Sequence, residues 1–376
     1  MATAKLIYAA GEASADMYYA TGLFTPDAFL YLEDQQGTRH ILISALEIDR
    51  ARRVAHVDEI HDWEKTRDAC HAHDQRSPNI ASLVTYFLRQ RGVEVAEVPG
   101  TFPLGLADLL RRAGITLTAT DGIFFPQRAV KTPAEVAAIR EALEITGQGM
   151  EVGIGLIIAS KIGNDGLLHL DGQPLTSERV RGEISAHLAR EGATASHTIV
   201  AGGEQGADPH EKGSGPLRAH WPIILDIFPR VERTGYWGDM SRTVCKGQPS
   251  ERVRRAWEAV RQAQEVACAR IRPGASGYAI HQAVRDHLTA AGFVTGPTAD
   301  GRQGGFFHGT GHGVGLDIHE SPRISEQESV LQAGHVVTVE PGLYYPDMGG
   351  VRLEDVVLVE ESGCTNLTTY PKFLEV

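Results

Sequence analysis

The first 125 residues alternate short apolar runs with longer stretches in which apolar positions recur at helical spacing. The short runs predict strands and the periodic stretches predict helices. The predicted strands are AFLYLED (28–34), HILISALE (40–47), GVEVAEV (92–98) and GITLTAT (114–120), and the predicted helices cover 48–56, 79–91 and 104–113. Such alternation is typical of an α/β domain, which we place at residues 1–125. No part of it gathers residue types suited to catalysis.

The pattern changes after residues 122–131. The motif TPAE at 132–135 offers an N-cap Thr, a Pro at the first helical position and a Glu three residues after the cap. Apolar side chains then follow at helical spacing, namely Val136, Ile139, Leu143 and Met150. We therefore expect a second domain over 126–376, opening with a long helix over 132–152.

This second domain contains a diverged internal repeat. The predicted helix 132–152 resembles 250–271, and VRGEISAHLAREGA (180–193) aligns without gaps on IHQAVRDHLTAAGF (280–293). Two acidic pairs complete the match, since Asp226 and Asp239 lie thirteen residues apart and Glu340 and Glu354 lie fourteen apart. Each half predicts two helices followed by a hairpin with two carboxylates. Two such halves would face each other across a pseudo-twofold axis in an α+β domain.

Composition narrows the class of protein. The chain has 376 residues, of which 42% are hydrophobic and 22% charged, as in ordinary soluble globular proteins of two domains. The net charge of −12 argues against nucleic acid or an anionic membrane as partner. No apolar run is long enough for a signal peptide or for the roughly 18–20 residues of a membrane span. Four widely separated cysteines without a CxxC motif indicate reduced thiols, and hence a cytoplasmic location.

The four acidic residues of the repeat lie in or beside strand-like runs, where acids are depleted and rarely buried unpaired. Asp226 and Asp239 belong to IILDIFPRVERTGYWGDMSRTV, Glu340 and Glu354 to VVTVEPGLYYPDMGGVRLEDVVLV, and His312 lies between them in HGTGHGVGLDIHE. One interpretation is that each acid is a solvated turn residue. The other is that two divalent metal ions give all four a partner, and ion pairs about 3.5–4 Å apart are a recurring hydrolytic device.

The donor set suggests which ions these would be. Four carboxylates offer four negative charges against two divalent ions, so a water between the ions could ionise near neutral pH. Oxygen ligands with one imidazole suit Mn²⁺, Co²⁺ or Zn²⁺, and the absence of thiolates disfavours a structural zinc site. Glu340, beside that water, is the natural general base and later the acid for the leaving nitrogen.

Over nearly its whole length the chain resembles the pita-bread metallopeptidases, specifically the Xaa-Pro aminopeptidase and prolidase branch. The resemblance rests on RAVKTPAEVAAIR, HGTGHGVGLDIHE, EPGLYY and GVRLED, and on ligands in the order D, D, H, E, E. It implies a creatinase/prolidase-like N-terminal α/β domain and a pita-bread catalytic domain. It also implies that Asp226 chelates one ion, that His312 and Glu340 bind the other, and that Asp239 and Glu354 bridge the two.

One departure from the family concerns the first acidic pair. The family usually has DxG at the first aspartate and eleven residues to the second, whereas here Asp226 is followed by Ile227 and Phe228 and Asp239 lies thirteen residues on. The two extra residues are most easily absorbed in the turn PRVERTG, which leaves the strand ends and ligands in place. We expect the altered turn to shape the substrate site.

Several further side chains receive roles. His308 would hydrogen-bond a metal-bound group or orient a ligand. The resemblance implies that His319 contacts the substrate carbonyl and developing oxyanion and that His210, on a Gly-rich loop, closes over the scissile bond. Arg323, in HESPRIS, could grip a free carboxylate with both guanidinium nitrogens, as in members that cleave dipeptides, or could be a solvated surface arginine. Arg352 is interpreted as a cation near the substrate that holds the bridging carboxylates or contacts His210.

The resulting hypothesis is a dinuclear metallopeptidase that cleaves short proline-containing peptides, with an Xaa-Pro dipeptidase preferred. Proline preference follows from the resemblance; its physical basis is that the imide nitrogen lacks an N–H and has a fixed φ. The alternatives are an Xaa-Pro aminopeptidase acting on longer peptides, a carboxypeptidase-like variant, creatinase, methionine aminopeptidase, and an inactive binding module of the same fold. The intact ligands disfavour creatinase and the inactive module, and the N-terminal domain disfavours methionine aminopeptidase. We also expect a homodimer in which the N-terminal domain shields the partner's active-site mouth.

Overall fold

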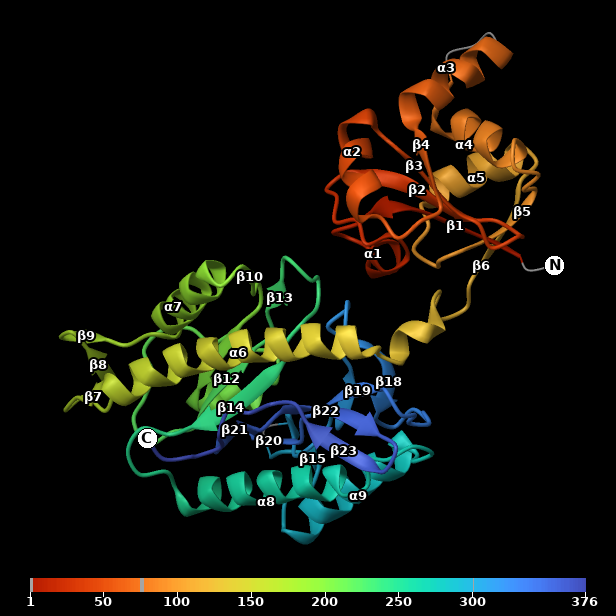
Figure 1. Ribbon diagram of the computed structural model, residues 1–376. Coiled ribbons are helices and arrows are strands. Elements are labelled where there is room, and N and C mark those ends of the chain that lie inside the picture. The colour runs from red at the N-terminus through yellow and green to blue at the C-terminus, as the bar shows by residue number, and fades with distance from the viewer. Residues whose placement is uncertain (1–2, 75–77, 300) are drawn as a thin grey trace. The chain divides into compact units, whose positions relative to one another are not determined.

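The computed structural model describes residues 3–74, 78–299 and 301–376. The chain divides into two compact units, residues 1–128 and 129–376 (Figure 1). The sequence placed the boundary three residues earlier, after residue 125. The short 3₁₀ helix η1 (Pro126–Ala129) spans the junction, and the long helix of the second unit follows it.

The first unit is built on a mixed six-stranded sheet in the order β4-β3-β2-β1-β5-β6. β1, β2 and β3 are antiparallel neighbours, whereas β3–β4, β1–β5 and β5–β6 are parallel pairs. The strands are β1 (Ala4–Ala10), β2 (Ala28–Glu33), β3 (Arg39–Ile43), β4 (Glu59–Asp62), β5 (Val95–Val98) and β6 (Thr116–Ala119).

Helices cover both faces of this sheet, because both faces carry buried apolar side chains. Leu30, Leu32 and Leu42 pack with residues of α4 and α5, while Tyr31 and Ile41 pack with residues of α1 and α2. The helices are α1 (Ala15–Thr21), α2 (Ala45–Val54), α3 (Trp63–Asp74), α4 (Ile80–Arg89) and α5 (Leu104–Arg112). The predicted α/β class of this domain is confirmed.

The predicted boundary between a strand and the helix that follows it is misplaced in this unit. The strand expected over 40–47 ends at Ile43, and the helix expected over 48–56 begins at Ala45. Ser44 explains both, because its side chain accepts a hydrogen bond from the Leu46 N–H and caps the helix. The elements β1, α1, β4 and α3 were not predicted. Two of them, β4 and α3, carry mostly polar or half-buried side chains and therefore give little periodic signal.

The second unit is an α+β domain, as the sequence predicted. Its helices are α6 (Pro133–Ala159), α7 (Ser177–Arg190), α8 (Glu251–Cys268) and α9 (Gly277–Ala290), with the 3₁₀ helix η2 (Gly203–Ala207). One three-stranded sheet has the order β11-β12-β14 and a five-stranded sheet the order β18-β17-β19-β22-β23. These strands are β11 (Ile199–Gly202), β12 (Ile223–Ile227), β14 (Met240–Val244), β17 (Gly311–Gly313), β18 (Glu320–Ile324), β19 (Val336–Val339), β22 (Asp355–Glu360) and β23 (Gly363–Asn366).

Shorter strands complete the second unit in small sheets. They are β7 (Lys161–Ile162), β8 (Leu168–Leu170), β9 (Gln173–Pro174), β10 (Ala193–Thr194), β13 (Arg230–Val231), β15 (Gly296–Pro297), β16 (Gln303–Gly304), β20 (Gly342–Tyr345) and β21 (Gly349–Arg352). β20 and β21 form a hairpin between β19 and β22, and β13 pairs with β10.

The internal repeat is visible in the packing. α6 and α7 pack on the β11-β12-β14 sheet through one apolar core, and α8 and α9 pack on strands of the β17-β19-β22 sheet through another. In Figure 1, α6 and α8 lie on opposite sides of the strands. α6 approaches its sheet closely at Gly153, where an added Cβ would come within 2.7 Å of a Leu225 methyl carbon.

Helix α6 begins as the sequence predicted. The Thr132 side chain accepts from the Glu135 N–H and the Glu135 carboxylate accepts from the Thr132 N–H, which completes the capping box. The helix runs seven residues beyond the expected end at 152, because buried Ile154 and Ile157 extend its apolar face. Among the described residues it is the one helix long and apolar enough to cross a membrane by composition, contrary to our expectation, and half of its most apolar window is buried within the protein.

The acidic residues lie at the ends of paired strands in both halves. Asp226 is in β12 opposite Ser241 of β14, and Asp239 directly precedes β14. Val339 and Asp355 are opposite each other in β19 and β22, so Glu340 and Glu354 continue from the same end of that ladder. The pairing of the strands therefore determines where all four acidic residues lie.

Arg242 of β14 ties the two halves together. Its side chain is almost fully buried and donates to Asp355 Oδ1 at 2.9 Å and to the Glu354 carbonyl at 2.6 Å. It also donates to the Pro371 and Tyr370 carbonyls, which fastens the C-terminal segment. A buried guanidinium with this many acceptors is far more costly to remove than an exposed one.

We therefore expect Arg242→Met to lower the free energy of unfolding by about 3–5 kcal/mol, because it leaves Asp355 Oδ1 and several buried carbonyls without the donor that Arg242 provides. Denaturant unfolding followed by tryptophan fluorescence measures this, since Trp221, Trp237 and Trp257 lie in the second unit. The control is Arg261→Met on α8, whose solvent-accessible ion pairs with Glu258 and Glu265 should contribute about 0–1 kcal/mol. Equal effects of the two substitutions would contradict the role given to Arg242.

Candidate metal centre

All five predicted ligands line one cavity of about 1080 Å³ in the second unit. Asp226, Asp239, His312 and Glu354 are buried, and Glu340 is partly buried. The ligand atoms of Asp239, His312 and Glu354 lie within 4.8 Å of one another, close enough to hold one ion. The cavity also contains the other predicted side chains, which are His210, His308, His319, Arg323 and Arg352.

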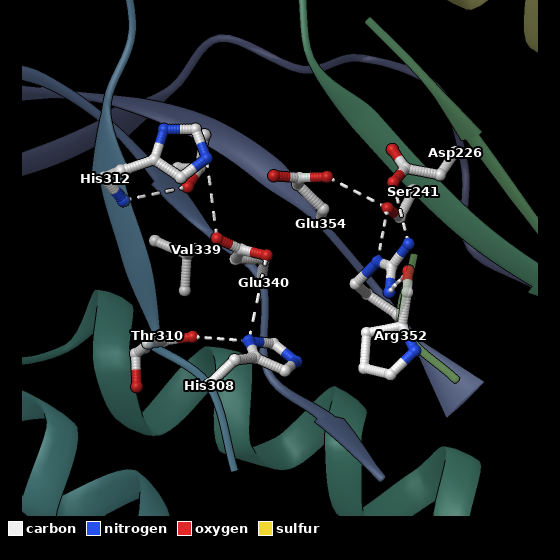
Figure 2. Close-up of polar contacts among 12 residues, drawn as sticks. Asp226, Ser241, His308, Thr310, His312, Val339, Glu340, Arg352 and Glu354 are labelled. Atoms are coloured by element: carbon white, nitrogen blue, oxygen red, sulfur yellow. Dashed lines mark hydrogen bonds and ion pairs between the residues drawn. The ribbon is translucent and has the colours of Figure 1, made fainter. Parts of the chain in front are cut away.

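His312 presents one nitrogen to the carboxylates. Its Nδ1 lies 3.1 Å from the Gly313 carbonyl, which can only accept, so Nδ1 carries the proton and Nε2 has a free lone pair. Nε2 lies 3.6 Å from Asp239 Oδ2 and 3.5 Å from Glu340 Oε1 (Figure 2). Burial, reinforced by His319, lowers the pKa of His312 to about 3, so the ring is neutral at pH 7. A neutral imidazole with this orientation can bind a metal ion through Nε2.

His308 lies on the other side of Glu340. Its Nδ1 donates to the Gly309 carbonyl at 2.8 Å, and its Nε2 lies 2.9 Å from the Tyr344 hydroxyl. Nδ1 is 4.0 Å from Glu340 Oε2. Burial lowers the pKa of His308 to about 3. The neutral ring therefore accepts from Tyr344 and lies beside Glu340 without an ion pair.

Arg352 is the cation nearest the carboxylates. It donates to Asp226 Oδ2 at 2.7 Å and to the Ser241 hydroxyl at 2.9 Å, and Ser241 donates in turn to Glu354 Oε2 at 2.9 Å (Figure 2). It reaches the loop that carries His210 through the Pro209 carbonyl, at 3.2 Å. The sequence interpretation joined Arg352 to the bridging carboxylates. In the structure its direct partner is Asp226, and it reaches Glu354 through Ser241.

The carboxylates are buried close together and repel one another. Burial first, and then the neighbouring carboxylates, raise the pKa of Asp239 and Glu354 well above the usual range. Burial raises the pKa of Glu340 to about 7. One arginine cannot offset four clustered acids, so the site favours further positive charge.

The donor set fits divalent metal ions. Asp226 Oδ1 is buried and has no hydrogen-bond partner among the described residues, although an unpartnered buried carboxylate oxygen is costly. Oxygen donors with one neutral imidazole are suitable ligands for Mn²⁺, Co²⁺ or Zn²⁺. A metal ion would give this oxygen a partner and relieve the repulsion between the acids.

The remaining predicted side chains surround the ligands. The rings of His319 and His312 meet edge to face at 4.4 Å between centroids, and His319 is exposed to the cavity. Arg323 is opposite His312 in the β17–β18 pair. Within the described part of the chain, its guanidinium forms no hydrogen bond or ion pair. His210 is exposed on its loop at the cavity wall.

Two groups of contributors were missed at the sequence level. Ser241 and Tyr344 hold Glu354, Arg352 and His308 in place through hydrogen bonds. Aromatic side chains line the cavity where we could not name any, namely Phe228, Phe306 and Phe307. A usable signal existed, since Tyr344 belongs to EPGLYY, and Phe306 and Phe307 directly precede HGTGH.

The long segment between Asp226 and Asp239 leaves the strands in register. Ile227 pairs with Met240, and the segment beyond them carries β13 and a tight turn closed by the Val231 N–H and the Tyr236 carbonyl at 3.0 Å. β13 leaves this hairpin to pair with β10. The extra length is therefore used outside the ladder, as expected, and Phe228 at its start lines the cavity.

A cavity with these donors in a pita-bread domain is typical of the class of metal-dependent hydrolases. The sequence profile of metallopeptidase family M24 matches residues 137–361. The chain is 34% identical over 300 residues to the uncharacterized peptidase YqhT of Bacillus subtilis, covering 76% of this chain and 82% of that protein. It is 32% identical over 253 residues to the Xaa-Pro dipeptidase of Pyrococcus furiosus, covering 66% and 65%.

The fold also matches solved structures along the whole chain. The X-Pro aminopeptidase from Thermotoga maritima superimposes with a TM-score of 0.81 at 24% identity, covering all of this chain and 97% of that one. The chain belongs to metallopeptidase family M24 and is a peptidase that depends on divalent metal ions. The family resemblance inferred from the motifs is confirmed, and the reading as an inactive binding module is set aside.

The raised carboxylate pKa values predict an unusual effect in metal-free protein. Because the folded-state pKa of Glu354 exceeds its unfolded value of 4.5, its contribution to stability falls as the pH rises above that value. Glu354→Gln should thus stabilise the chelator-treated protein relative to wild type, by a margin that is larger at pH 7.5 than at pH 5. Each 1 kcal/mol of that margin should raise the Tm by about 2–4 °C.

The measurement is a pair of melting curves in chelator at the two pH values. Glu361→Gln, on an exposed carboxylate, is the control and should show no pH-dependent margin. Adding Mn²⁺ should reverse the order, because wild type keeps its full ligand set. A Glu354→Gln protein that is less stable than wild type in chelator at pH 7.5 would refute the repulsion argument.

Proposed function

We propose that this chain is a dinuclear metal-dependent Xaa-Pro dipeptidase. The observation that carries the proposal is the convergence in one cavity of five potential ligands and of Arg323, which has no partner among the described residues. The Pyrococcus furiosus relative is named an Xaa-Pro dipeptidase, which supports the substrate class. A homodimer and a cytoplasmic location stay predictions.

Two ions account for the number and spread of the donors. Asp226, whose Oδ1 has no hydrogen-bond partner among the described residues, would serve one ion and His312 with Glu340 the other, and Asp239 and Glu354 would contribute to both. When bound, divalent ions supply Lewis-acid polarisation of the scissile carbonyl and acidify water. The protein side chains supply everything else.

Glu340 is the proton carrier. It is the least buried of the four acids, with a side chain 18% exposed, and it faces the cavity. Its pKa of about 7 suits a group that takes a proton from water and returns it to the leaving nitrogen at neutral pH. His308 and His312 lie on either side and are neutral, so neither neutralises its charge in advance.

His319 and His210 would act on the substrate. Both are exposed in the cavity and neither ring is needed to hold the carboxylates. An imidazole N–H from His319 can stabilise negative charge that develops on the scissile carbonyl oxygen. The His210 loop is tied to Arg352 through Pro209, so this histidine is held close to the metal ligands.

Arg323 supplies the preference for dipeptides. A guanidinium at the wall of an acidic cavity, without a partner in the described part of the chain, can bind the C-terminal carboxylate of a dipeptide with two hydrogen bonds. A longer peptide carries that carboxylate beyond reach. The phenylalanines of the wall offer apolar surface for the proline ring, which brings no N–H that needs a partner.

Glu340→Gln should lower kcat for an X-Pro dipeptide by about 10²–10⁴-fold, because proton transfer by a positioned group contributes this much. The measurement is steady-state kinetics with excess Mn²⁺, because the excess metal ion compensates for weaker metal binding by the variant. The control is Glu326→Gln in the same cavity, whose carboxylate pairs with Arg285 and should leave kcat near wild type. Near-normal turnover by Glu340→Gln would place the base elsewhere.

Arg323→Ala should lower kcat/KM for X-Pro at least tenfold, since losing one partner of a buried charge pair costs about 2–5 kcal/mol. Tripeptides of the form X-Pro-Y should be affected much less. Arg285→Ala, which removes a guanidinium already paired with Glu326, is the matched control and should not discriminate between the two substrates. Faster cleavage of X-Pro-Y than of X-Pro, with no response to Arg323→Ala, would replace the dipeptidase by an Xaa-Pro aminopeptidase.

A further inference from the structure

A second cluster of potential metal ligands lies in the first unit, where the sequence indicated no reactive group. His40 of β3 and Glu59 of the edge strand β4 are directly paired in the parallel ladder, and His61 lies two residues further along β4. Residues two apart in a strand point to the same face, so all three side chains share one face of the sheet. We propose that His40, Glu59 and His61 form a zinc site separate from the catalytic cavity.

The distances between the three donor atoms match a coordination sphere. His40 Nδ1 lies 3.2 Å from Glu59 Oε2 and 3.3 Å from His61 Nε2, and the last two atoms lie 3.1 Å apart. Zinc binds nitrogen and oxygen at about 2.0–2.2 Å, so neighbouring ligands of a tetrahedral ion lie about 3.3–3.5 Å apart. The triangle needs a few tenths of an ångström of expansion to admit the ion.

The contact with Asp34 decides which nitrogen of His40 can bind an ion. Asp34 Oδ2 lies 3.1 Å from His40 Nε2 and can only accept, so that nitrogen carries a proton. Nδ1 is therefore the nitrogen that faces Glu59 Oε2, at 3.2 Å. A zinc ion bound there would take the place of any proton between these two atoms.

Asp34 provides a second, independent indication of a metal ligand. Metal-binding histidines almost always donate their other N–H to a carboxylate or carbonyl, which fixes the ring. The Asp34 carboxylate is itself fixed by the N–H groups of Gln36 and Thr38, both at 2.9 Å. The His40 side chain is only 5% exposed, whereas Glu59 is 52% exposed, so the site is rigid at its base and open to ions on one side.

Arg91 is the competing cation. Its terminal nitrogen lies 3.0 Å from His61 Nε2 and 3.3 Å from Nδ1, and it can only donate, so His61 accepts from it. The same guanidinium stacks on Phe87, 3.6 Å from the ring centroid. Burial, together with Arg91 and His40, lowers the pKa of His61 to about 4, which keeps the ring neutral. Zinc must displace this contact, and Arg91 therefore weakens the site without abolishing it.

An ion in this position would cross-link the edge strand to the sheet. β4 is short and has one neighbour, β3, so it depends on few backbone hydrogen bonds. Ligands on both strands would hold β4 against β3. The role inferred is structural, and hydrolysis in the other unit does not depend on it.

The test uses the full-length chain, stripped of metal and then equilibrated by dialysis against buffered zinc, with elemental analysis of zinc per chain. Wild type should bind one zinc more than Glu59→Gln or His61→Gln, two substitutions at partly exposed positions. Asp34→Asn should keep the site but weaken it about 10–100-fold, as expected for a partner that orients a ligand. His197→Ala, on an exposed histidine of the second unit, is the control and should bind as wild type.

The competing role of Arg91 gives a result in the opposite direction. Arg91→Gln removes a positive charge next to the site, so zinc should bind this variant more tightly than wild type. Peptidase activity in Mn²⁺ should be unchanged in Glu59→Gln, which separates the result from any failure of the catalytic proposal. Equal zinc content in wild type, Glu59→Gln and His61→Gln would overturn the proposal, and unchanged affinity in Arg91→Gln would overturn the role given to Arg91.

Discussion

The structure of the second unit depends on the burial of four carboxylates at the ends of two facing strand pairs. Water would normally stabilise such charges, and its removal raises the pKa of Asp239, Glu340 and Glu354. The fold keeps the acids together because their positions follow from the ladders β12–β14 and β19–β22, which large apolar cores hold in place. The packing of the helices thus keeps four carboxylates together although they repel one another.

Two arginines provide positive charge near the four acids, one in direct contact with them and one behind them. Arg352 contacts the acids directly through Asp226 and Ser241, while Arg242 lies behind them and holds the backbone of Glu354 and the carboxylate of Asp355. Neither faces Asp226 Oδ1, which keeps that oxygen available for an ion. The arginines therefore fix the geometry of the ligands without neutralising the charge that attracts the metal.

The sequence predicted the candidate site better than it predicted the elements around it. Asp226, Asp239, Glu340 and Glu354 stood out because acids in apolar runs need partners, and His312 stood out by its place between the two pairs in HGTGHGVGLDIHE. All five line one cavity. Ser241 and Tyr344 were not found, because a hydroxyl in a strand carries no signal until its neighbours are known. The same limit applies to β4, whose residues EIHD show no apolar alternation and are placed only by pairing with β3.

Both units bring potential metal ligands together, but the negative charge that neighbouring cations leave uncompensated differs between them. In the second unit several carboxylates converge on a cavity, and the charge is too large for a single arginine to offset. In the first unit one carboxylate and two imidazoles converge, and Arg91 already donates to one of the imidazoles. Affinity for a cation rises with the negative charge left uncompensated, so the catalytic cavity should fill first. The site in the first unit should fill only where its ligands outcompete Arg91 for zinc, which makes that arginine the residue that sets its affinity.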